Sequence, residues 1–151
     1  MRHLFLWQAA VEVPDLEWAM GIELVEEAWG ESTVRHQNLR QSDVENSKIQ
    51  FVRKDLMAYE ADELPNASHV YVFAAGMPPE LQHHLCRLLC KQSGIEKVAV
   101  VIDGQTGRGK TSLSTLLTKS SCYDMLPDLK MHGIMRGSGS GKTVVMFSRA
   151  E

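Results

Sequence analysis

Two acidic residues, Glu23 and Asp55, follow short apolar stretches that both have the pattern of β-strands. The polar segment between these stretches is suited to a helix. Two parallel strands joined by a helix bring their carboxyl ends to one edge of a sheet, where open α/β sheets bind ligands. One carboxylate there can accept hydrogen bonds from both hydroxyl groups of a ribose, and the other from an adenine amine. The pair therefore fits an adenosine-containing cofactor, although each residue alone also fits a helix cap or a solvated turn.

A second candidate site is the segment Gly104 to Thr111, GQTGRGKT, which satisfies the phosphate-loop pattern and lies between an apolar strand and a predicted helix. Its backbone amides and Lys110 would surround the phosphates of a nucleotide, and its threonine would bind Mg²⁺. No later apolar strand ends in a magnesium-binding aspartate, because Asp124 and Asp128 flank Pro127 in an expected connecting segment. The alternative interpretation is a basic loop near a substrate.

The cysteines and histidines do not have the spacing of metal ligands. Cys86 and Cys90 lie at i, i+4 on an apolar helix face, and with Cys122 we expect three reduced core thiols. His83 and His84 are adjacent, so a helix would point them about 100° apart. We therefore predict no metal site.

The composition is that of an ordinary globular chain, with 151 residues, 44% hydrophobic and 23% charged residues, and a net charge of −3. This length fits a single domain over residues 1–151. No apolar run reaches the ~20 residues of a membrane span, and the first residues lack a signal-peptide pattern. We expect an intracellular protein without a membrane partner, and the net charge gives no general attraction to nucleic acid.

Hydrophobic periodicity and turn residues predict alternating helices and strands. The predicted helices are His3 to Glu12, Leu24 to Ser42, Pro79 to Gln92 (with Leu81, Leu85, Leu88 and Leu89 inward) and Thr111 to Lys119, with a turn or short helix from Tyr59 to Asn66. The predicted strands are one that ends at Glu23, then Lys48 to Val52, His69 to Ala74, Lys97 to Ile102, Leu129 to Met135 and Thr143 to Ser148.

This order predicts an α/β fold with a mostly parallel sheet and a carboxyl-terminal antiparallel hairpin. The glycine-rich segment Arg136 to Lys142 would form the hairpin connection. A glycine loop moved to the carboxyl end by circular permutation is the weaker interpretation, because the residues that follow favour a strand over a helix.

The order of elements and the motifs resemble the class I methyltransferases that use S-adenosylmethionine. In that family an acidic residue ends the second strand and binds the cofactor ribose, and another follows the third strand and faces the adenine. The resemblance implies a Rossmann-like methyltransferase fold with S-adenosylmethionine as cofactor. It also implies a cofactor-binding set made of Glu23, Asp55, Leu56, Phe73 and Ala74, and it names no catalytic residue.

Within this class, the run Trp7-Gln8-Ala9-Ala10 resembles a V-Q-A-A run in the disruptor of telomeric silencing family of non-SET histone lysine methyltransferases. The spacing of GIEL, of the strand to Asp55 and of the segment Asp62 to Leu85 is similar too. This resemblance implies lysine methylation of a histone or another protein, contact with the nucleosome and a nuclear location, with the cytoplasm as the alternative.

Two family features are absent from the sequence. The first strand and its D-x-G-x-G-x-G loop would precede His3, so we expect an amino-terminally truncated methyltransferase domain with weak cofactor binding. The paired asparagines that follow the family's fourth strand are replaced here by Ala74-Ala75-Gly76-Met77. Two alternatives therefore remain: a non-catalytic interaction module with the same fold, and a nucleotide triphosphatase that uses Gly104 to Thr111.

Overall fold

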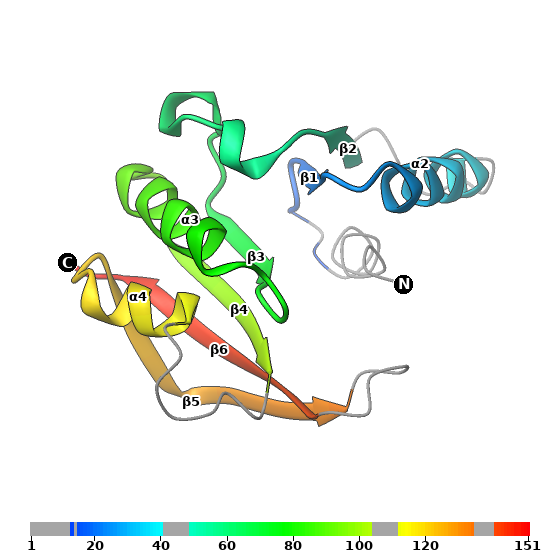
Figure 1. Ribbon diagram of the computed structural model, residues 1–151. Helices are drawn as coiled ribbons and strands as arrows, with labels where there is room; N and C mark the ends of the chain where they lie inside the picture. The colour runs from blue at the N-terminus through cyan, green and yellow to red at the C-terminus, as the bar shows by residue number, and fades with distance from the viewer. Residues whose placement is uncertain (1–12, 14, 41–48, 104–111, 135–140) are drawn as a thin grey trace. The chain divides into compact units, whose positions relative to one another are not determined.

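The computed structural model describes residues 13, 15–40, 49–103, 112–134 and 141–151, with backbone alone for 35–40, 103, 128–134 and 141 (Figure 1). The chain divides into two compact units, Met1–Ala58 and Tyr59–Glu151, each with its own sheet. The predicted helix from His3 to Glu12 lies outside the described residues, as do Gly104 to Thr111 and most of the predicted hairpin connection.

In the first unit, two parallel strands are joined by one long helix. β1 (Ala19–Glu23) and β2 (Ile49–Arg53) pair in register from Ala19↔Ile49 to Glu23↔Arg53. The connecting helix α2 (Glu26–Arg40) has two glutamates in its first turn, where the helix dipole favours negative charge. The indole nitrogen of Trp29 donates to the carbonyl oxygen of Phe51 over 3.3 Å and holds the helix against β2. The predicted strand–helix–strand order of this segment is confirmed.

The second unit contains a four-stranded mixed sheet made of β3 (His69–Phe73), β4 (Lys97–Asp103), β5 (Tyr123–Ile134) and β6 (Gly141–Arg149), in the order β3-β4-β6-β5. β3 and β4 are parallel, and β6 is antiparallel to both β4 and β5. Helices α3 (Pro79–Lys91) and α4 (Leu113–Lys119) lie on the same face of this sheet (Figure 1). Two 3₁₀ helices precede these elements: η2 (Leu56–Ala58, in the first unit) and η3 (Ala61–Glu63).

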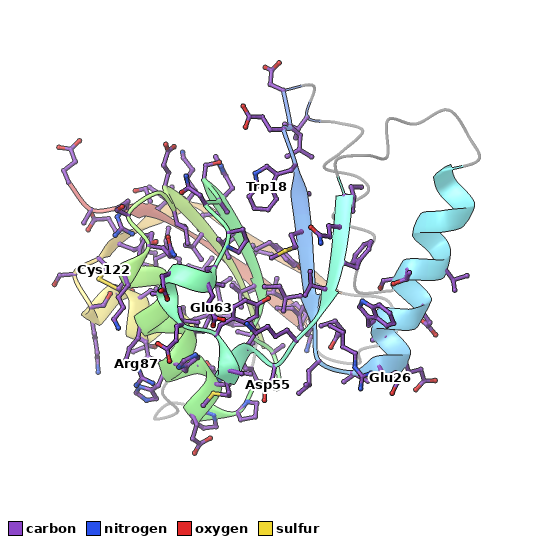
Figure 2. All side chains as sticks on the ribbon, turned by 90° about the horizontal axis from the view of Figure 1, so that it is seen from above. Trp18, Glu26, Asp55, Glu63, Arg87 and Cys122 are labelled. Atoms are coloured by element: carbon purple, nitrogen blue, oxygen red, sulfur yellow. A yellow bond between two sulfur atoms is a disulfide. The ribbon has the colours of Figure 1, made fainter. Side chains whose placement is uncertain are left out.

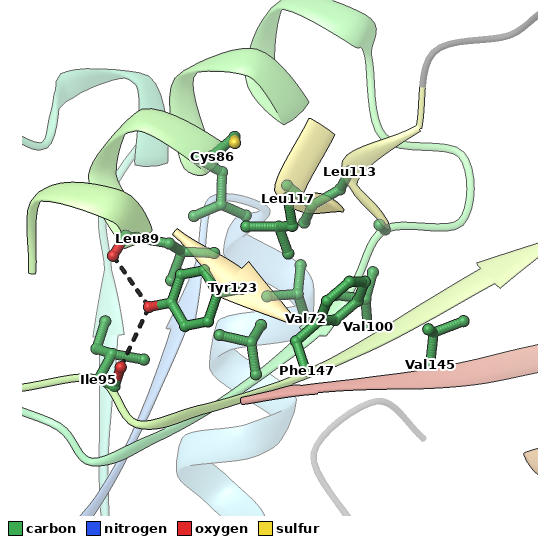
Figure 3. Packing of buried hydrophobic residues seen from close by; sticks show 13 residues of the cluster. Val72, Cys86, Leu89, Ile95, Val100, Leu113, Leu117, Tyr123, Val145 and Phe147 are labelled. Carbon is green, nitrogen blue, oxygen red and sulfur yellow. Dashed lines mark hydrogen bonds between the residues drawn. The ribbon is translucent and has the colours of Figure 1, made fainter. Parts of the chain in front are cut away.

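The core of the second unit lies between the two helices and the sheet (Figure 3). α3 starts with a proline at its first positions, where no backbone donor is needed, and turns Leu85, Leu88 and Leu89 inward as predicted. Leu81, also predicted inward, is half-buried. Strand residues Val72, Val98, Val100, Val145 and Phe147 face these helices and are fully or almost fully buried. Burial of this apolar surface is the main source of the unit's stability.

β5 begins at Tyr123, six residues before the predicted start at Leu129, so the expectation of a connecting segment around Pro127 is wrong. The β5–β6 register shifts between Leu126 and Met131. β5 is the last strand in the sheet order, and proline is tolerated in edge strands and at bulges because its missing N–H need not join a ladder. The segment around Pro127 therefore has the sequence pattern of a loop but forms a bulged strand in the structure.

In the described part of the chain, no helix is long and apolar enough to cross a membrane.

Candidate ligand-binding edge

Glu23 is the last residue of β1, and its carboxylate folds back onto the chain that follows. Its Oε1 atom accepts hydrogen bonds from the N–H groups of Leu24 and Val25 at 3.0 and 3.1 Å. The turn-cap interpretation of this residue is therefore realised. A carboxylate offers about four lone-pair sites on two oxygens, so this capping role is compatible with binding a ligand as well.

Asp55 lies at the same edge of the β1–β2 sheet as Glu23. The N–H group of Lys54 donates to the carbonyl oxygen of Glu23 over 3.2 Å, directly beyond the Glu23↔Arg53 pair of the ladder. The Oδ1 atom of Asp55 accepts from the N–H group of Met57 at 2.9 Å and starts η2. The prediction that both acidic residues follow the carboxyl ends of adjacent parallel strands is confirmed.

Exposed apolar side chains adjoin both carboxylates in the chain. Leu24 is 56% exposed, Val25 is 52% exposed and Met57 is 47% exposed, and each lies one or two residues beyond Glu23 or Asp55. Leu56, which the resemblance places in the cofactor site, is half-buried. Adjacent acidic and exposed apolar residues suit a ligand with a flat apolar ring and polar hydroxyl or amine groups. No sequence pattern marks Leu24, Val25 or Met57 as exposed, because exposure cannot be read from an apolar residue beside a strand.

One ion pair lies at this end of the first unit. Arg53 Nη2 is 3.3 Å from Glu26 Oε2, and both side chains are largely exposed, with relative exposures of 47% and 74%. Figure 2 shows Glu26 and Asp55 at the same end of the β1–β2 pair. Exposed ion pairs contribute little to stability, so we assign this pair at most a minor part in the stability of the first unit.

Phe73 and Ala74, the other predicted cofactor residues, belong to the second unit. Phe73 ends β3 and pairs with Val101, and the N–H group of Ala74 donates to the Val101 carbonyl oxygen over 2.9 Å. Ala74 is buried and starts a turn in which Gly76 has φ +76°, a conformation that favours glycine. Each half of the predicted site therefore lies at the carboxyl end of a parallel strand pair, and the cleft that would unite the halves stays a prediction.

The strand and helix required around a phosphate loop are both present, as β4 and α4. The loop itself, Gly104 to Thr111, lies outside the described residues. The parallel neighbour of β4 is β3, which ends at Phe73 and continues into Ala74-Ala75-Gly76, whereas β6 on the other side is antiparallel. In the described chain, therefore, no aspartate follows the neighbouring parallel strand in the position that binds magnesium.

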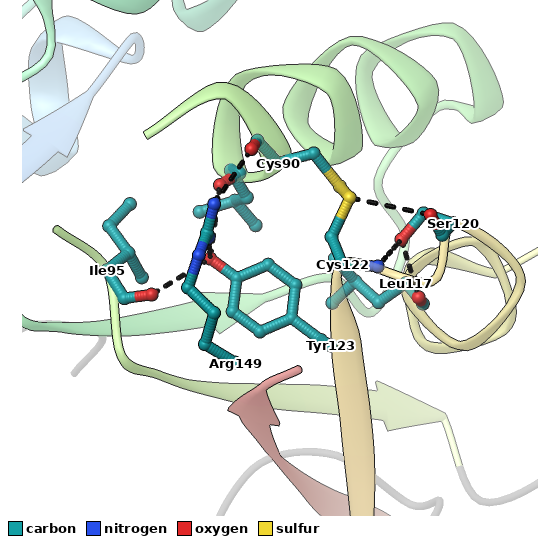
Figure 4. Close-up of a disulfide and its surroundings, with 8 residues drawn as sticks. Cys90, Ile95, Leu117, Ser120, Cys122, Tyr123 and Arg149 are labelled. Atoms are coloured by element: carbon teal, nitrogen blue, oxygen red, sulfur yellow. Dashed lines mark hydrogen bonds between the residues drawn. A yellow bond between two sulfur atoms is a disulfide. The ribbon is translucent and has the colours of Figure 1, made fainter. Parts of the chain in front are cut away.

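Two of the three cysteines form a disulfide, so the expectation of three reduced thiols is wrong (Figure 4). Cys90 near the end of α3 is bonded to Cys122 just before β5, with the Cα atoms 5.6 Å apart. The i, i+4 spacing of Cys86 and Cys90 did not predict this pair, because the partner of Cys90 is Cys122, 32 residues further along the chain. Cys86 is free and buried, and burial raises the pKa of its thiol.

Arg149, which no sequence pattern marks, joins the end of β6 to the end of α3. Its guanidinium donates to the hydroxyl of Tyr123 at 2.9 Å and to the carbonyl oxygens of Cys90 and Leu89 at 3.0 and 3.4 Å. It also lies over the Tyr123 ring, 5.2 Å from the ring centre (Figure 4). The Tyr123 hydroxyl donates onward to the carbonyl oxygens of Leu89 and Ile95. These contacts satisfy the last carbonyl groups of a helix and are structural.

In the described residues, no three His, Cys, Asp or Glu side chains come together in a group that could hold a metal ion.

No family model and no curated protein matches this chain. Solved structures do match it. The methyltransferase domain of bacterial CtHen1 has a TM-score of 0.65 and 11% identity, over 92% of this chain and 83% of that one. N-methyltransferase NodS from Bradyrhizobium japonicum, in complex with S-adenosyl-L-homocysteine, has a TM-score of 0.64 and 13% identity, over 95% and 72%. An rRNA methylase from Streptococcus thermophilus has a TM-score of 0.54 and 10% identity, over 89% and 74%.

These similarities show the fold of the chain. It is α/β with the Rossmann-like class I methyltransferase fold, including a parallel strand pair in each sheet and the predicted carboxyl-terminal antiparallel hairpin of β5 and β6.

Proposed function

We propose that this chain is a methyltransferase that uses S-adenosylmethionine. The observation that carries the proposal is the position of Glu23 and Asp55, which follow two hydrogen-bonded parallel strands in a chain with the methyltransferase fold. A further support is that the NodS structure was solved with S-adenosyl-L-homocysteine, the product that remains after methyl transfer.

The residues present fit an adenosine-containing cofactor. We assign the ribose hydroxyl groups to Glu23 and the adenine amine to Asp55, because a carboxylate accepts hydrogen bonds from both kinds of donor. Leu56 would pack against the adenine from the first unit. We also assign to the cofactor Phe73, the last residue of β3, and Ala74, which starts the turn after β3 and has a small side chain that permits close contact.

When bound, S-adenosylmethionine supplies an already activated methyl group. The chain's own residues then need only to bind it, exclude water and align the acceptor with it, and such alignment alone can lower a barrier by ~7–11 kcal/mol. The proposal therefore requires no acid–base triad.

For the methyl acceptor we propose a lysine side chain of a histone or another protein, with contact to the nucleosome and a nuclear location. The support for this finer proposal is the sequence resemblance at Trp7-Gln8-Ala9-Ala10 and the spacing that follows it. The solved structures named above include an N-methyltransferase and an rRNA methylase, so the fold is compatible with several acceptors. Transfer of labelled methyl groups to nucleosomes, free histones and RNA in parallel reactions would distinguish them. Labelled RNA with unlabelled histones would contradict the protein acceptor.

Calorimetric titration of the intact chain with S-adenosyl-L-homocysteine tests the cofactor assignment. We expect saturable binding that Glu23→Ala weakens by about tenfold or more, because hydrogen bonds to charged groups contribute ~1.5–3 kcal/mol each. Glu27→Ala is the matched control, since Glu27 is an exposed glutamate in the first turn of α2, close in sequence to Glu23. Equal affinities in all three proteins would place the ligand elsewhere.

The second candidate function, a nucleotide triphosphatase, is favoured by one observation: β4 and α4 flank Gly104 to Thr111 as a phosphate loop requires. Titration with ATP and magnesium tests it. Micromolar binding that Lys110→Ala abolishes would support the triphosphatase and contradict our proposal. Binding of S-adenosyl-L-homocysteine without methyl transfer to any acceptor would instead support a non-catalytic module.

A further inference from the structure

Gln82, near the start of α3, forms side-chain hydrogen bonds with two different segments of the second unit. Its Nε2 group donates to the carbonyl oxygen of Met77 over 2.7 Å, and its Oε1 atom accepts from the N–H group of Leu113 over 2.6 Å. Met77 closes the turn that follows β3, and Leu113 is the first residue of α4, the helix that follows β4. One half-buried amide thus joins the segments that follow two neighbouring parallel strands.

Both partners of Gln82 are themselves fixed to the core. The N–H group of Met77 donates to the carbonyl oxygen of Ala74 over 3.1 Å, which closes the turn that starts at Ala74. Leu113 is fully buried, and Figure 3 shows it packed beside Leu117 in α4. Gln82 therefore sets the spacing between a turn that begins at a predicted cofactor residue and the start of a packed helix.

We propose that Gln82 is a positioning residue for ligand binding at the carboxyl ends of β3 and β4. The proposal rests on the proposed function, in which Ala74 approaches the cofactor. Gln82 acts through Met77 and Leu113 and does not itself touch the ligand. An amide suits this role at neutral pH, because it carries a donor and an acceptor on one short planar group.

Three variants separate this role from general stability. Gln82→Leu keeps the approximate size and loses both hydrogen bonds. Gln82→Glu keeps an acceptor for Leu113 but places a carboxylate oxygen against the Met77 carbonyl oxygen. Gln92→Leu is the matched control, since Gln92 is also half-buried and sits at the opposite end of α3, where its side chain donates to the carbonyl oxygen of Ala61.

The first measurement does not depend on the proposed function. In amide hydrogen exchange followed by NMR, Leu113 should exchange about tenfold faster in Gln82→Leu than in the unsubstituted chain, and Met77 should also accelerate. Gln92→Leu should leave both amides unchanged. Unchanged exchange of Leu113 and Met77 in Gln82→Leu would overturn the proposal.

The second measurement is the affinity for S-adenosyl-L-homocysteine. Gln82→Leu should bind about tenfold more weakly, whereas Gln92→Leu should stay within about twofold of the unsubstituted chain. Equal affinities in the two variants would overturn the positioning role and leave the proposed function intact. Failure of the unsubstituted chain to bind would instead contradict the proposed function. Hydrogen exchange alone would then test whether Gln82 joins Met77 to Leu113.

The glutamate variant adds a signature that loss of stability alone would not give. A protonated carboxylic acid can donate to Met77 while its other oxygen accepts from Leu113. The affinity of Gln82→Glu relative to the unsubstituted chain should therefore recover as the pH falls from about 7 to about 4, through the ordinary pKa range of a glutamate. A ratio that stays constant over this range would contradict the donor role of the amide.

Discussion

The N–H group of Lys54 donates to the carbonyl oxygen of Glu23 over 3.2 Å, so the two segments that carry the predicted cofactor carboxylates are hydrogen-bonded where β1 and β2 end. Asp55 is the next residue, and its carboxylate already holds the Met57 N–H group. The backbone at this edge is therefore already ordered before a ligand binds. Binding would add ligand donors to carboxylates that the strands and turns have already positioned.

Asp55→Asn should reduce the preference of the chain for adenine over hypoxanthine. A carboxylate accepts from the adenine 6-amine and repels the 6-oxo group of an inosine analogue, whereas an asparagine amide can adapt to either. We expect S-adenosyl-L-homocysteine to bind about tenfold more tightly than its S-inosyl analogue, and Asp55→Asn to remove most of that difference. The asparagine oxygen can still accept from Met57, so the melting temperature should change little. Asp62→Asn, at an exposed aspartate in η3, should keep the full preference.

Arg149→Ala should destabilise the second unit. The substitution leaves the carbonyl oxygens of Cys90 and Leu89 without their charged donor and removes the cation above Tyr123. We expect a loss of about 2 kcal/mol in the free energy of unfolding, measured by urea titration. Arg87→Ala removes an exposed arginine from α3 and should cost about 0.5 kcal/mol or less. Equal effects of the two substitutions would show that Arg149 is not a structural link.

The chain should lose stability in alkaline solution. Burial raises the pKa of Tyr123 above 10.0 despite the opposing effect of Arg149, and burial raises the pKa of Cys86 above 9.0. Both groups stay neutral in the folded chain at a pH where the unfolded chain ionises. Their contribution is therefore complete below the unfolded pKa values and is lost as the pH rises through the folded values. The urea midpoint of the unsubstituted chain should fall as the pH rises above about 9. In the double variant Tyr123→Phe/Cys86→Ser this fall should be smaller, even if the midpoint of the variant at neutral pH is lower.

Reduction of the Cys90–Cys122 disulfide should lower stability without changing the fold. The bond closes a loop with a sequence separation of 32 residues, for which the chain-entropy model gives about 3–4 kcal/mol. Unfolding midpoints with and without dithiothreitol measure this effect. Cys90→Ser should be insensitive to the reductant, while Cys86→Ser should respond as the unsubstituted chain does. A response to reductant in Cys90→Ser would contradict the pairing.

Local sequence patterns predicted most elements of this fold correctly. β1, β2, β3, β4, α2 and α3 lie within a few residues of their expected bounds. The strands and α3 are marked by apolar residues with glycine, proline or polar residues at their ends, whereas α2 was expected as the polar segment that joins two apolar strands. The neighbouring positions of Glu23 and Asp55 followed from the same pattern through the geometry of parallel strands. The start of β5 was missed because a proline between two aspartates has the same local signature in a loop and in a bulged edge strand.

The contacts that join distant segments could not be predicted in this way. Cys122 meets Cys90, Arg149 meets Tyr123 and Gln82 meets Leu113 only after the sheet and helices have packed. The spacing of residues along the chain does not predict such pairs. Neither glutamine nor arginine has a secondary-structure preference that would indicate a hydrogen bond between distant segments. The exposed apolar residues Leu24 and Met57 were missed for a related reason, since exposure is a property of the packed chain.

Titration of the isotopically labelled intact chain with S-adenosyl-L-homocysteine, followed by the backbone amide signals in NMR, tests directly where the cofactor binds. We expect saturable shifts in two groups of amides, Glu23 to Val25 with Asp55 to Met57 in the first unit, and Phe73 to Gly76 in the second. We expect Glu23→Ala to weaken the shifts of the first group, because the Glu23 carboxylate would accept hydrogen bonds from the ligand. Saturable shifts that leave Glu23, Asp55 and their neighbours unchanged, or an absence of any shift at millimolar ligand, would contradict the assignment of this edge as the S-adenosylmethionine site.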